Sequence, residues 1–322
     1  ETAVAGSKEH LMTPPQAQCV VGYTVDNTFY VSGCAVRIDQ WLVVPDHVKS
    51  AIQHNPLTLR SYSGTEVVLD IKTEDVIHVD TDLLALSLQE SVFSRLGLSK
   101  FKVADLSDVA GNYVSVIGAY GKGTTGTLRH SVLFGKVDYS GSTFKGYSGG
   151  AYTKSNQIVG IHLHGGVTNS GYSASYVLCM LKYLCKVKDE DTADWLELVK
   201  TKKSKVRFES SWGLEDVKLR VGGRYHIVPR DDLRRVYGES WETALSESQS
   251  GNWRVKPAHS DGAIVCENAG ECQTQSCGAS TALTTSGPKG DELLLAVTKQ
   301  EWLAFRQYLG NQKLRKQETQ SS

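Results

Sequence analysis

Short apolar and alternating segments follow one another along the first half of the chain, and Gly, Asn, Asp or Ser residues separate them. Alternation with a period of two residues is typical of half-buried strands. Many short strands at this spacing, with no long helical period, predict an antiparallel barrel or sandwich in two halves, joined near residues 91–108. The expected strands are Cys19–Thr24, Phe29–Ile38, Trp41–Val44, Leu57–Tyr62, Glu66–Ile71, Leu83–Leu88, Tyr113–Ala119, Thr127–Val137 and Ile158–Leu163.

The pattern changes on both sides of these strands. A polar stretch with Pro14-Pro15 precedes them, and Ser175–Val187 after them has the period of a helix. Beyond residue 188 the composition predicts a poorly defined α+β or partly disordered tail, in which a capping box at Thr298 starts one helix. The expected parts are an extended arm at 1–18, a domain at 19–188, a charged linker at 189–251 and a small region with one helix at 252–322.

Charge and composition narrow the class of protein. The 322 residues carry 35 basic and 35 acidic side chains, so no overall field favours nucleic acid or membranes. The hydrophobic content of 40% fits a globular protein, and no run reaches the roughly 18 apolar residues of a membrane span. The sequence starts with Glu1 and shows no signal peptide, and we expect it to be part of a longer chain.

Seven cysteines, an odd number, do not form an evident disulfide framework. Cys19 and Cys34 lie on neighbouring predicted strands and could pair, but a chain of this size rarely needs disulfides. Reduced thiols and an intracellular setting are therefore expected. Cys266, Cys272 and Cys277 lack a C-x-x-C pair, so we predict no zinc site there, and no other metal or cofactor.

The segment Gly146–Gly150, with the sequence GYSGG, is the first candidate for chemistry. A serine between glycines suits a nucleophile on a tight turn, because glycine permits unusual backbone angles and lets N–H groups approach the reacting atom. The amides of Gly146 and Ser148 can then form an oxyanion hole. An isolated segment of this kind is as often a simple Gly/Ser turn, so a base and an orienting acid must be found elsewhere.

His47 is the candidate base, because it follows the apolar strand Trp41–Val44 and can be held rigidly beside a core. The alternative is a surface histidine on a turn. Asp82 is the candidate acid, since it directly precedes an apolar strand and can orient an imidazole. Asp75 and Asp80 are the alternatives, and Asp82 can also be a plain turn residue.

Taken together, these residues run His47, Asp82, Ser148 along the chain, which is the order found in chymotrypsin-like serine proteases. Residues 19–187 resemble that family. The resemblance implies an all-β fold of two antiparallel six-stranded β-barrels with a closing C-terminal helix. It also implies a serine endopeptidase in which His47 is the general base, Asp82 orients it and Ser148 is the nucleophile.

The numbers of residues between these positions indicate a particular group within the chymotrypsin-like family. The motif T-x-x-G-x-S-G begins at Thr143, with 34 residues between His47 and Asp82 and 60 between Asp82 and Thr143. This arrangement resembles the serine protease of sobemovirus-type polyproteins.

A second motif, G-I-H-x-x-G at residues 160–165, is similar to the substrate-pocket strand of viral proteases that cut after Glu or Gln. The resemblance implies that His162 and Thr143 contact the P1 side chain. A pocket that ends in an imidazole and a hydroxyl selects a carboxylate or amide, because other substrates leave its polar groups unpaired. His164 shares the sheet face and is the alternative, and His162 can also be a satisfied core residue.

A protease that cuts its own polyprotein after Glu should have sites nearby, and Glu is followed by Ser or Thr more often here than composition predicts. The candidate cleavage sites follow Glu1, Glu239, Glu242, Glu247 and Glu318.

The tail bears a weaker likeness to a genome-linked protein (VPg), which follows the protease in sobemovirus-type polyproteins. The letters of a W-A-D motif occur in another order at Ala193–Trp195, and a basic run at 200–207 can contact viral RNA phosphates. A solvated charged linker is the alternative. Tyr225 and Tyr237 are the candidate RNA-linked residues.

The sequence therefore predicts a serine endopeptidase that processes its own viral polyprotein after Glu or Gln. We expect no membrane segment in this fragment, and we expect the enzyme to act in the host cytoplasm, in association with a replication complex through upstream segments. A cellular trypsin-like or heat-shock-type serine protease is one alternative. A protease-fold RNA-binding module without activity is the other.

Overall fold

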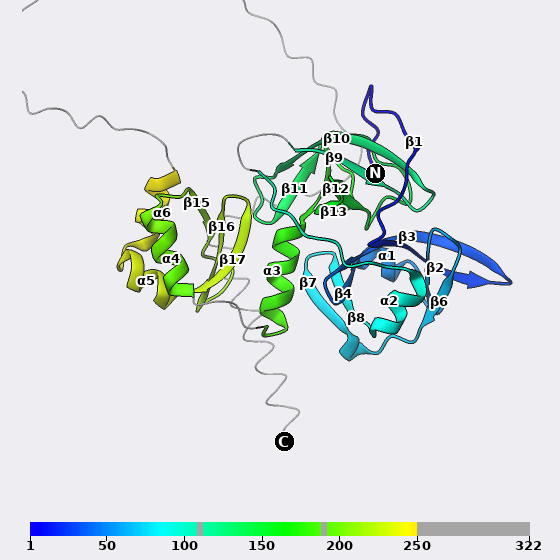
Figure 1. Cartoon of the computed structure of the whole chain (residues 1–322), viewed down its shortest axis with the longest axis horizontal. Coiled ribbons are helices and arrows are strands. Elements are labelled where there is room, and N and C mark those ends of the chain that lie inside the picture. The colour runs from blue at the N-terminus through cyan, green and yellow to red at the C-terminus, as the bar shows by residue number, and fades with distance from the viewer. Residues whose placement is uncertain (108–111, 188–191, 250–322) are drawn as a thin grey trace, which may run out of the picture. The chain divides into compact units, whose positions relative to one another are not determined.

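The computed structural model describes residues 1–107, 112–187 and 192–249 (Figure 1). All of them belong to one compact unit of the chain, residues 1–255. The described elements include two seven-stranded sheets and one three-stranded sheet. Every strand pair within these sheets is antiparallel, so the all-β architecture expected from the alternation is confirmed.

The first sheet runs in the order β6-β5-β2-β3-β4-β8-β7 and curls around its own apolar cluster, which includes Leu42, Leu59, Leu84 and Phe93. Alternate side chains of each strand enter this cluster, as expected for half-buried strands. Its elements are β2 (Gln18–Val25), β3 (Thr28–Ile38), β4 (Trp41–Pro45), α1 (Asp46–Ser50), β5 (Leu57–Arg60), β6 (Glu66–Leu69), the 3-10 turn η1 (Thr73–Asp75), β7 (Val76–Asp80), β8 (Leu83–Ser87) and α2 (Glu90–Leu96).

Arg37 attaches helix α2 to this sheet. Its guanidinium is 2% exposed, donates to both carboxylate oxygens of Glu90 at 2.9 and 2.6 Å, and lies 4.1 Å over the Phe93 ring. The other terminal nitrogen of Arg37, Nη1, donates to the Leu98 carbonyl at 2.8 Å. The buried arginine is thus fully engaged, which is the condition under which such a charge is tolerated.

The second sheet closes into a six-stranded barrel, because β9 pairs with both β10 and β12. Strand β1 (His10–Leu11), from the N-terminal arm, adds to β10 at its edge. Val116, Leu128, Tyr139 and Tyr152 fill the interior. The barrel consists of β9 (Asn112–Ile117), β10 (Lys122–His130), β11 (Lys136–Tyr139), β12 (Ala151–Lys154), β13 (Gln157–His164) and β14 (Asn169–Ser173).

Helix α3 (Ala174–Leu184) follows the barrel, as its helical period predicts. Its Val177 and Leu181 share one apolar cluster with Val43 of the first sheet and Ile161 of the barrel. The two sheets therefore each have an apolar interior and are joined by this shared cluster with the helix.

Residues 192–249 form a small α+β region, with more order than their composition predicts. Apolar side chains spaced among many charges, including Leu196, Leu219, Val228 and Trp241, gather into one buried cluster. The elements are α4 (Thr192–Thr201), β15 (Val206–Glu209), β16 (Asp216–Val221), β17 (Arg224–Pro229), α5 (Arg230–Tyr237) and α6 (Trp241–Gln249). The expected helix at 298–310 lies outside the described residues.

Two sequence expectations need correction in detail. Thr127–Val137 was expected as one strand, but a turn closed by the Ser131 amide and the Lys136 carbonyl at 3.0 Å divides it into β10 and β11. The first sheet has seven strands in an open order rather than six in a closed barrel. Cys19 and Cys34, for which reduced thiols were favoured over a pair, are both buried and free, so they need no correction.

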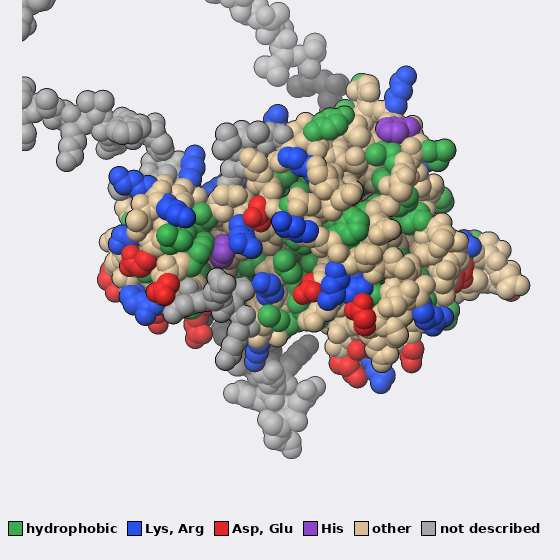
Figure 2. Space-filling view, viewed as in Figure 1, with side chains coloured by type: hydrophobic (Ala, Val, Ile, Leu, Met, Phe, Trp, Pro, Cys, Tyr) green, Lys and Arg blue, Asp and Glu red, His purple; other side chains and the backbone are tan. Residues whose placement is uncertain are grey.

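The surface in view mixes Lys and Arg with Asp and Glu, in line with the zero net charge (Figure 2). None of the described helices is long and apolar enough to cross a membrane.

Candidate active site

Strand pairing brings His47 beside Asp82. Strands β4 and β8 pair with Pro45 opposite Leu83, so α1 begins where the turn before β8 ends. One carboxylate oxygen of Asp82 accepts the His47 backbone N–H at 2.9 Å, and the other contacts His47 Nδ1 at 2.7 Å. The same carboxylate thus satisfies a free N–H at the start of α1 and orients the imidazole. His47 remains partly open to solvent, with 44% of its side chain exposed.

Asp82 adopts left-handed backbone angles, with φ at 58°, which is uncommon outside glycine but tolerated by Asp. This conformation ends the β7–β8 turn and places the Asp82 carbonyl 3.2 Å from the Asp46 amide. The two alternative acids point elsewhere. Asp80 accepts a hydrogen bond from the Tyr176 hydroxyl, and Asp75 accepts one from the Lys72 amide at 3.2 Å.

The loop that carries Ser148 packs against β3 and β4 of the first sheet, and β4 directly precedes the helix that contains His47. The Ser148 carbonyl accepts a hydrogen bond from the Cys34 amide at 2.8 Å. A Cβ placed on Gly33 would lie 2.7 Å from that carbonyl and 2.8 Å from Val48 Cγ2, so residue 48 and residue 148 meet across Gly33. Ser148 from the second barrel is therefore held against the segment that carries His47.

Two glycines shape this loop, Gly146 with φ at 95° and Gly149 with φ at 85°. Gly149 packs so closely that a Cβ there would collide with the Cys34 carbonyl and lie 2.9 Å from Pro45 Cδ. The N–H groups of Tyr147, Gly149 and Gly150 bond to the carbonyls of Phe144, His162 and Tyr147.

The amides of Gly146 and Ser148, by contrast, have no acceptor among the residues that the structure describes. Two unengaged N–H groups flanking a serine are what an oxyanion hole requires.

The side chain of His162 on β13 is fully buried and connects to Ser148 through Glu1. The Tyr152 hydroxyl lies 2.7 Å from its Nδ1, and a carboxylate oxygen of Glu1 lies 2.9 Å from its Nε2. Burial raises the pKa of Tyr152 well above its ordinary value, so this hydroxyl keeps its proton and donates to Nδ1. The network therefore assigns the proton of a neutral imidazole to Nε2.

The pKa shifts agree with this assignment. Burial lowers the pKa of His162, and the Glu1 carboxylate offsets that effect only in part. Burial alone would raise the pKa of the Glu1 carboxyl, but hydrogen bonds from His162 and Thr143 and the nearby charges hold it below its usual value. A neutral imidazole thus donates to an ionised carboxylate. The other Glu1 oxygen accepts a hydrogen bond from Ser148 Oγ at 3.1 Å.

Asn169 belongs to the same network of buried polar residues, and sequence reasoning did not identify it. The Thr143 hydroxyl donates to its side-chain oxygen at 2.6 Å, and its amide group donates to the Gly141 carbonyl at 2.8 Å. Both Thr143 and Asn169 are 1% exposed. The only signal in the sequence is a polar residue near His162, and no motif marks it. The alternative His164 is exposed at the surface, 3.5 Å from the Ser170 hydroxyl.

The structure thus combines a closed β-barrel, a second curled sheet and a His–Asp pair and serine at their junction. The fold is that of the chymotrypsin-like serine proteases.

Similarity to solved structures is distant. A Sesbania mosaic virus structure, described for aromatic interactions that drive coupled folding and binding of the intrinsically disordered VPg, is 19% identical, with a TM-score of 0.45 over 54% of this chain and 95% of that chain. The serine protease domain of the Sesbania mosaic virus polyprotein is 17% identical, with a TM-score of 0.42 over 56% of this chain and 99% of that chain. A serine endoprotease from Yersinia pestis is 15% identical, with a TM-score of 0.42 over 54% and 64%. No protein-family model and no curated protein matches the sequence.

The candidate cleavage sites fall in different surroundings. Glu239 lies between α5 and α6 with its side chain 89% exposed, and Glu242 lies in the first turn of α6. Glu247 falls in α6, and Glu318 lies outside the described residues, as do Cys266, Cys272 and Cys277. Cleavage at these positions stays a prediction.

The basic run at 200–207 spans the end of α4 and the start of β15, where Lys200 Nζ donates to the Val236 carbonyl at 2.5 Å. RNA binding by this run stays a prediction. Tyr225 is 4% exposed and packs edge-on against Tyr176 and Phe134, with ring centroids 5.2 and 5.3 Å apart. A role as an RNA-linked residue would therefore require Tyr225 to leave this packing.

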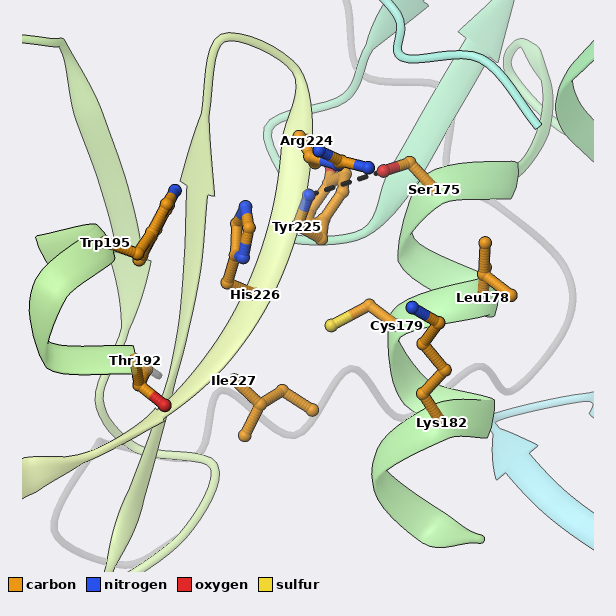
Figure 3. A pocket seen from close by; sticks show the side chains of 10 residues that line it. All are labelled: Ser175, Leu178, Cys179, Lys182, Thr192, Trp195, Arg224, Tyr225, His226 and Ile227. Atoms are coloured by element: carbon orange, nitrogen blue, oxygen red, sulfur yellow. Dashed lines mark hydrogen bonds between the residues drawn. The ribbon is translucent and has the colours of Figure 1, made fainter. Parts of the chain in front are cut away.

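A cavity of about 290 Å³ lies where α3 faces β17 (Figure 3). Cys179 and Lys182 of α3 line one side, and His226 and Ile227 of β17 line the other. The Tyr225 amide donates to Ser175 Oγ at 3.4 Å at one end. The cavity is separate from the residues around Ser148.

Proposed function

We propose that this chain is a serine endopeptidase that cuts polypeptides after Glu, or Gln, with His47, Asp82 and Ser148 as its catalytic residues. The observation that carries the proposal is the carboxylate of Glu1, which lies between His162 Nε2 and Ser148 Oγ. A glutamate side chain therefore fits the pocket next to the nucleophile.

In the proposed reaction these three side chains act in turn. His47, oriented by Asp82, takes the proton of Ser148 as the oxygen attacks the scissile carbonyl, and returns it to the leaving amine. The amides of Gly146 and Ser148 stabilise the developing oxyanion, a contribution on the order of 3 kcal/mol. Water then attacks the acyl-enzyme by the same route and releases the acid.

Selection at P1 depends on polar groups without access to water. His162 supplies one N–H donor at full burial, whereas the Thr143 hydroxyl donates its proton to Asn169 and offers its oxygen as an acceptor. An apolar P1 side chain would leave the His162 N–H unpaired, and such a mismatch can reduce kcat/KM by about 10⁴. The N–H of a neutral imidazole can donate to either a carboxylate oxygen or an amide oxygen, so both Glu and Gln fit.

Peptides that differ only at P1 test the proposal. The full chain should cleave those with Glu or Gln and leave those with Lys or Leu largely intact, and Ser148→Ala should abolish cleavage. Preference for Lys or Leu would instead favour a cellular-type protease. No cleavage of any peptide would favour a binding module.

The proposed substrate is the chain's own polyprotein in the host cytoplasm. Mass spectrometry of the active chain and of Ser148→Ala should reveal fragments that end at Glu239, Glu242, Glu247 or Glu318 only in the active protein. Identical fragments in both would exclude self-processing at these positions.

We also propose that residues 192–249 form a region like a genome-linked protein. The observation that favours it is the packing of Tyr225 against Tyr176 of α3 and Phe134, given that aromatic contacts drive VPg binding in the Sesbania mosaic virus protein. Tyr225→Ala should lower the thermal stability of the chain and alter peptide cleavage. Unchanged stability and activity would contradict this role.

A further inference from the structure

The N-terminal arm places the Glu1 side chain where, in the proposed function, the P1 side chain of a substrate binds. The Glu1 side chain is only 20% exposed, and its carboxylate uses both the His162 donor and the Ser148 hydroxyl. Substrate and arm therefore need the same two groups.

Thr2 fixes the direction from which the arm arrives. Its N–H donates to Asn169 Oδ1 at 3.1 Å, and its carbonyl accepts from the Thr143 amide at 3.1 Å and from Asn169 Nδ2 at 2.7 Å. Its hydroxyl donates to the Gly166 carbonyl at 2.9 Å. A Cβ placed on Gly165 would lie 2.5 Å from the Glu1 carbonyl carbon, so this backbone has almost no free space.

The rest of the arm is attached along the second barrel. Buried Ser142 exchanges hydrogen bonds with Val4 and Ser7 at 2.7 to 3.1 Å. Glu9 accepts from the Tyr147 hydroxyl at 3.0 Å, and β1 pairs with β10. These contacts hold Glu1 close to the pocket even when its side chain leaves it.

The contact with Ser148 differs from that of a substrate. Ser148 Oγ donates to a side-chain carboxylate oxygen of Glu1. A carboxylate carbon is a poor electrophile, and a hydroxyl that donates to it is not positioned for attack. In this arrangement Ser148 Oγ therefore contacts the Glu1 side chain rather than the backbone carbonyl that cleavage after Glu1 would require.

We propose that residues 1–11 form an intramolecular competitive inhibitor, in which the Glu1 carboxylate fills the P1 pocket and its departure admits substrate. This inference rests on the proposed function, because the pocket must be the P1 pocket. A tethered ligand acts at an effective concentration on the order of millimolar, so even a weak intrinsic contact competes with substrate. If the pocket is filled ten times more often than it is free, removal of the carboxylate raises kcat/KM about tenfold.

Glu1→Ala in the full chain tests the inference, with Glu74→Ala, at an exposed surface glutamate, as the matched control. Two readouts are compared. One is kcat/KM for a peptide with Glu at P1. The other is the rate at which an alkyl fluorophosphonate forms an O–P bond with Ser148 and expels fluoride, which needs no Glu. Glu1→Ala should raise both about tenfold, and Glu74→Ala should change neither.

Glu1→Gln keeps the shape of the side chain and an acceptor for His162, so its increase should be smaller than that of Glu1→Ala. If Glu1→Ala reacts with the fluorophosphonate at the rate of the unchanged chain, the inhibitory role is wrong, whatever the peptide result. If labelling accelerates but no variant prefers Glu at P1, the inhibitory contact stands and the proposed specificity fails.

Discussion

Tyr152→Phe isolates the group that fixes the proton on His162. The substitution removes one hydroxyl at a fully buried position and leaves Nδ1 of a fully buried imidazole without its donor 2.7 Å away. An unpaired buried polar group costs about 1–3 kcal/mol. For a unit of this size, each kcal/mol lowers Tm by about 2–4 °C.

The effect on specificity follows from the same hydrogen bond. Without the Tyr152 donor, the imidazole can carry its proton on Nδ1, and Nε2 then repels a P1 oxygen. We expect kcat/KM for Glu and Gln peptides to fall about tenfold, which corresponds to about 1.4 kcal/mol. A peptide with Ala at P1, which does not reach His162, should be cleaved at an unchanged low rate.

The pH dependence of the Glu to Gln cleavage ratio tests the same hydrogen bond in a second way. A hydrogen bond donated to Nδ1 disfavours protonation there, so its loss raises the pKa of His162 towards its ordinary value. As pH falls, the imidazolium that forms would attract a carboxylate more than an amide. The ratio of Glu to Gln cleavage should therefore rise in Tyr152→Phe as pH falls, relative to the unchanged chain.

Tyr139→Phe is the matched control. Its hydroxyl lies 3.0 Å from Thr124 Oγ1 in the same barrel, and its ring packs 4.9 Å from that of Tyr152. It should lower Tm in a similar way without altering the Glu to Gln ratio. If Tyr152→Phe keeps full activity on Glu peptides with an unchanged ratio, His162 does not depend on Tyr152 and the proton assignment is wrong.

Three further predictions concern the same chain. Asp82→Asn should lower kcat by about 10³–10⁴ with an unchanged circular dichroism spectrum, because an amide cannot hold the tautomer of His47; a loss below tenfold would contradict its orienting role. Because burial lowers the pKa of His162, the stability that its neutral form contributes is complete above about pH 6.5 and declines as pH falls further. Between pH 7.5 and pH 5, the Tm of His162→Gln should therefore fall less than the Tm of the unchanged chain. Parallel Tm curves for the two proteins would contradict this account of His162. Arg37→Ala should cost about 2 kcal/mol in urea unfolding, because it removes the attachment of Glu90 and α2, and an unchanged midpoint would refute that account.

The sequence could predict that His47 and Asp82 lie together, because each adjoins an apolar strand, whereas the catalytic roles of His47, Asp82 and Ser148 stay a prediction. His47 comes after one apolar strand and Asp82 before another, and antiparallel pairing of β4 and β8 places such positions together. Chain order and strand boundaries were sufficient for this part of the site. The carboxylate's second role, as acceptor of the His47 amide, required coordinates.

The deeper pocket was less predictable because its contacts cross strands. Tyr152 reaches His162 from β12, and Asn169 reaches Thr143 from the first residue of β14, where a register shift between His162 and His164 alters the pairing. No sequence pattern specifies these registers. In the small region at 192–249 the sequence indicated a strand at Gly222–Val228 and a short helix at Asp231–Tyr237, which match β17 and α5. The extent of its order was underestimated, since its core residues are too sparse among charged ones to produce a clear period.

The tight packing of Gly149 limits how this molecule can be changed. Any side chain there would clash with Cys34 and Pro45, which belong to the first sheet. It would therefore separate the first sheet from the barrel that carries Ser148. In a library of variants, position 149 should therefore tolerate no replacement. Attempts to redirect cleavage by directed evolution should find their useful diversity at positions 143, 152 and 169 instead.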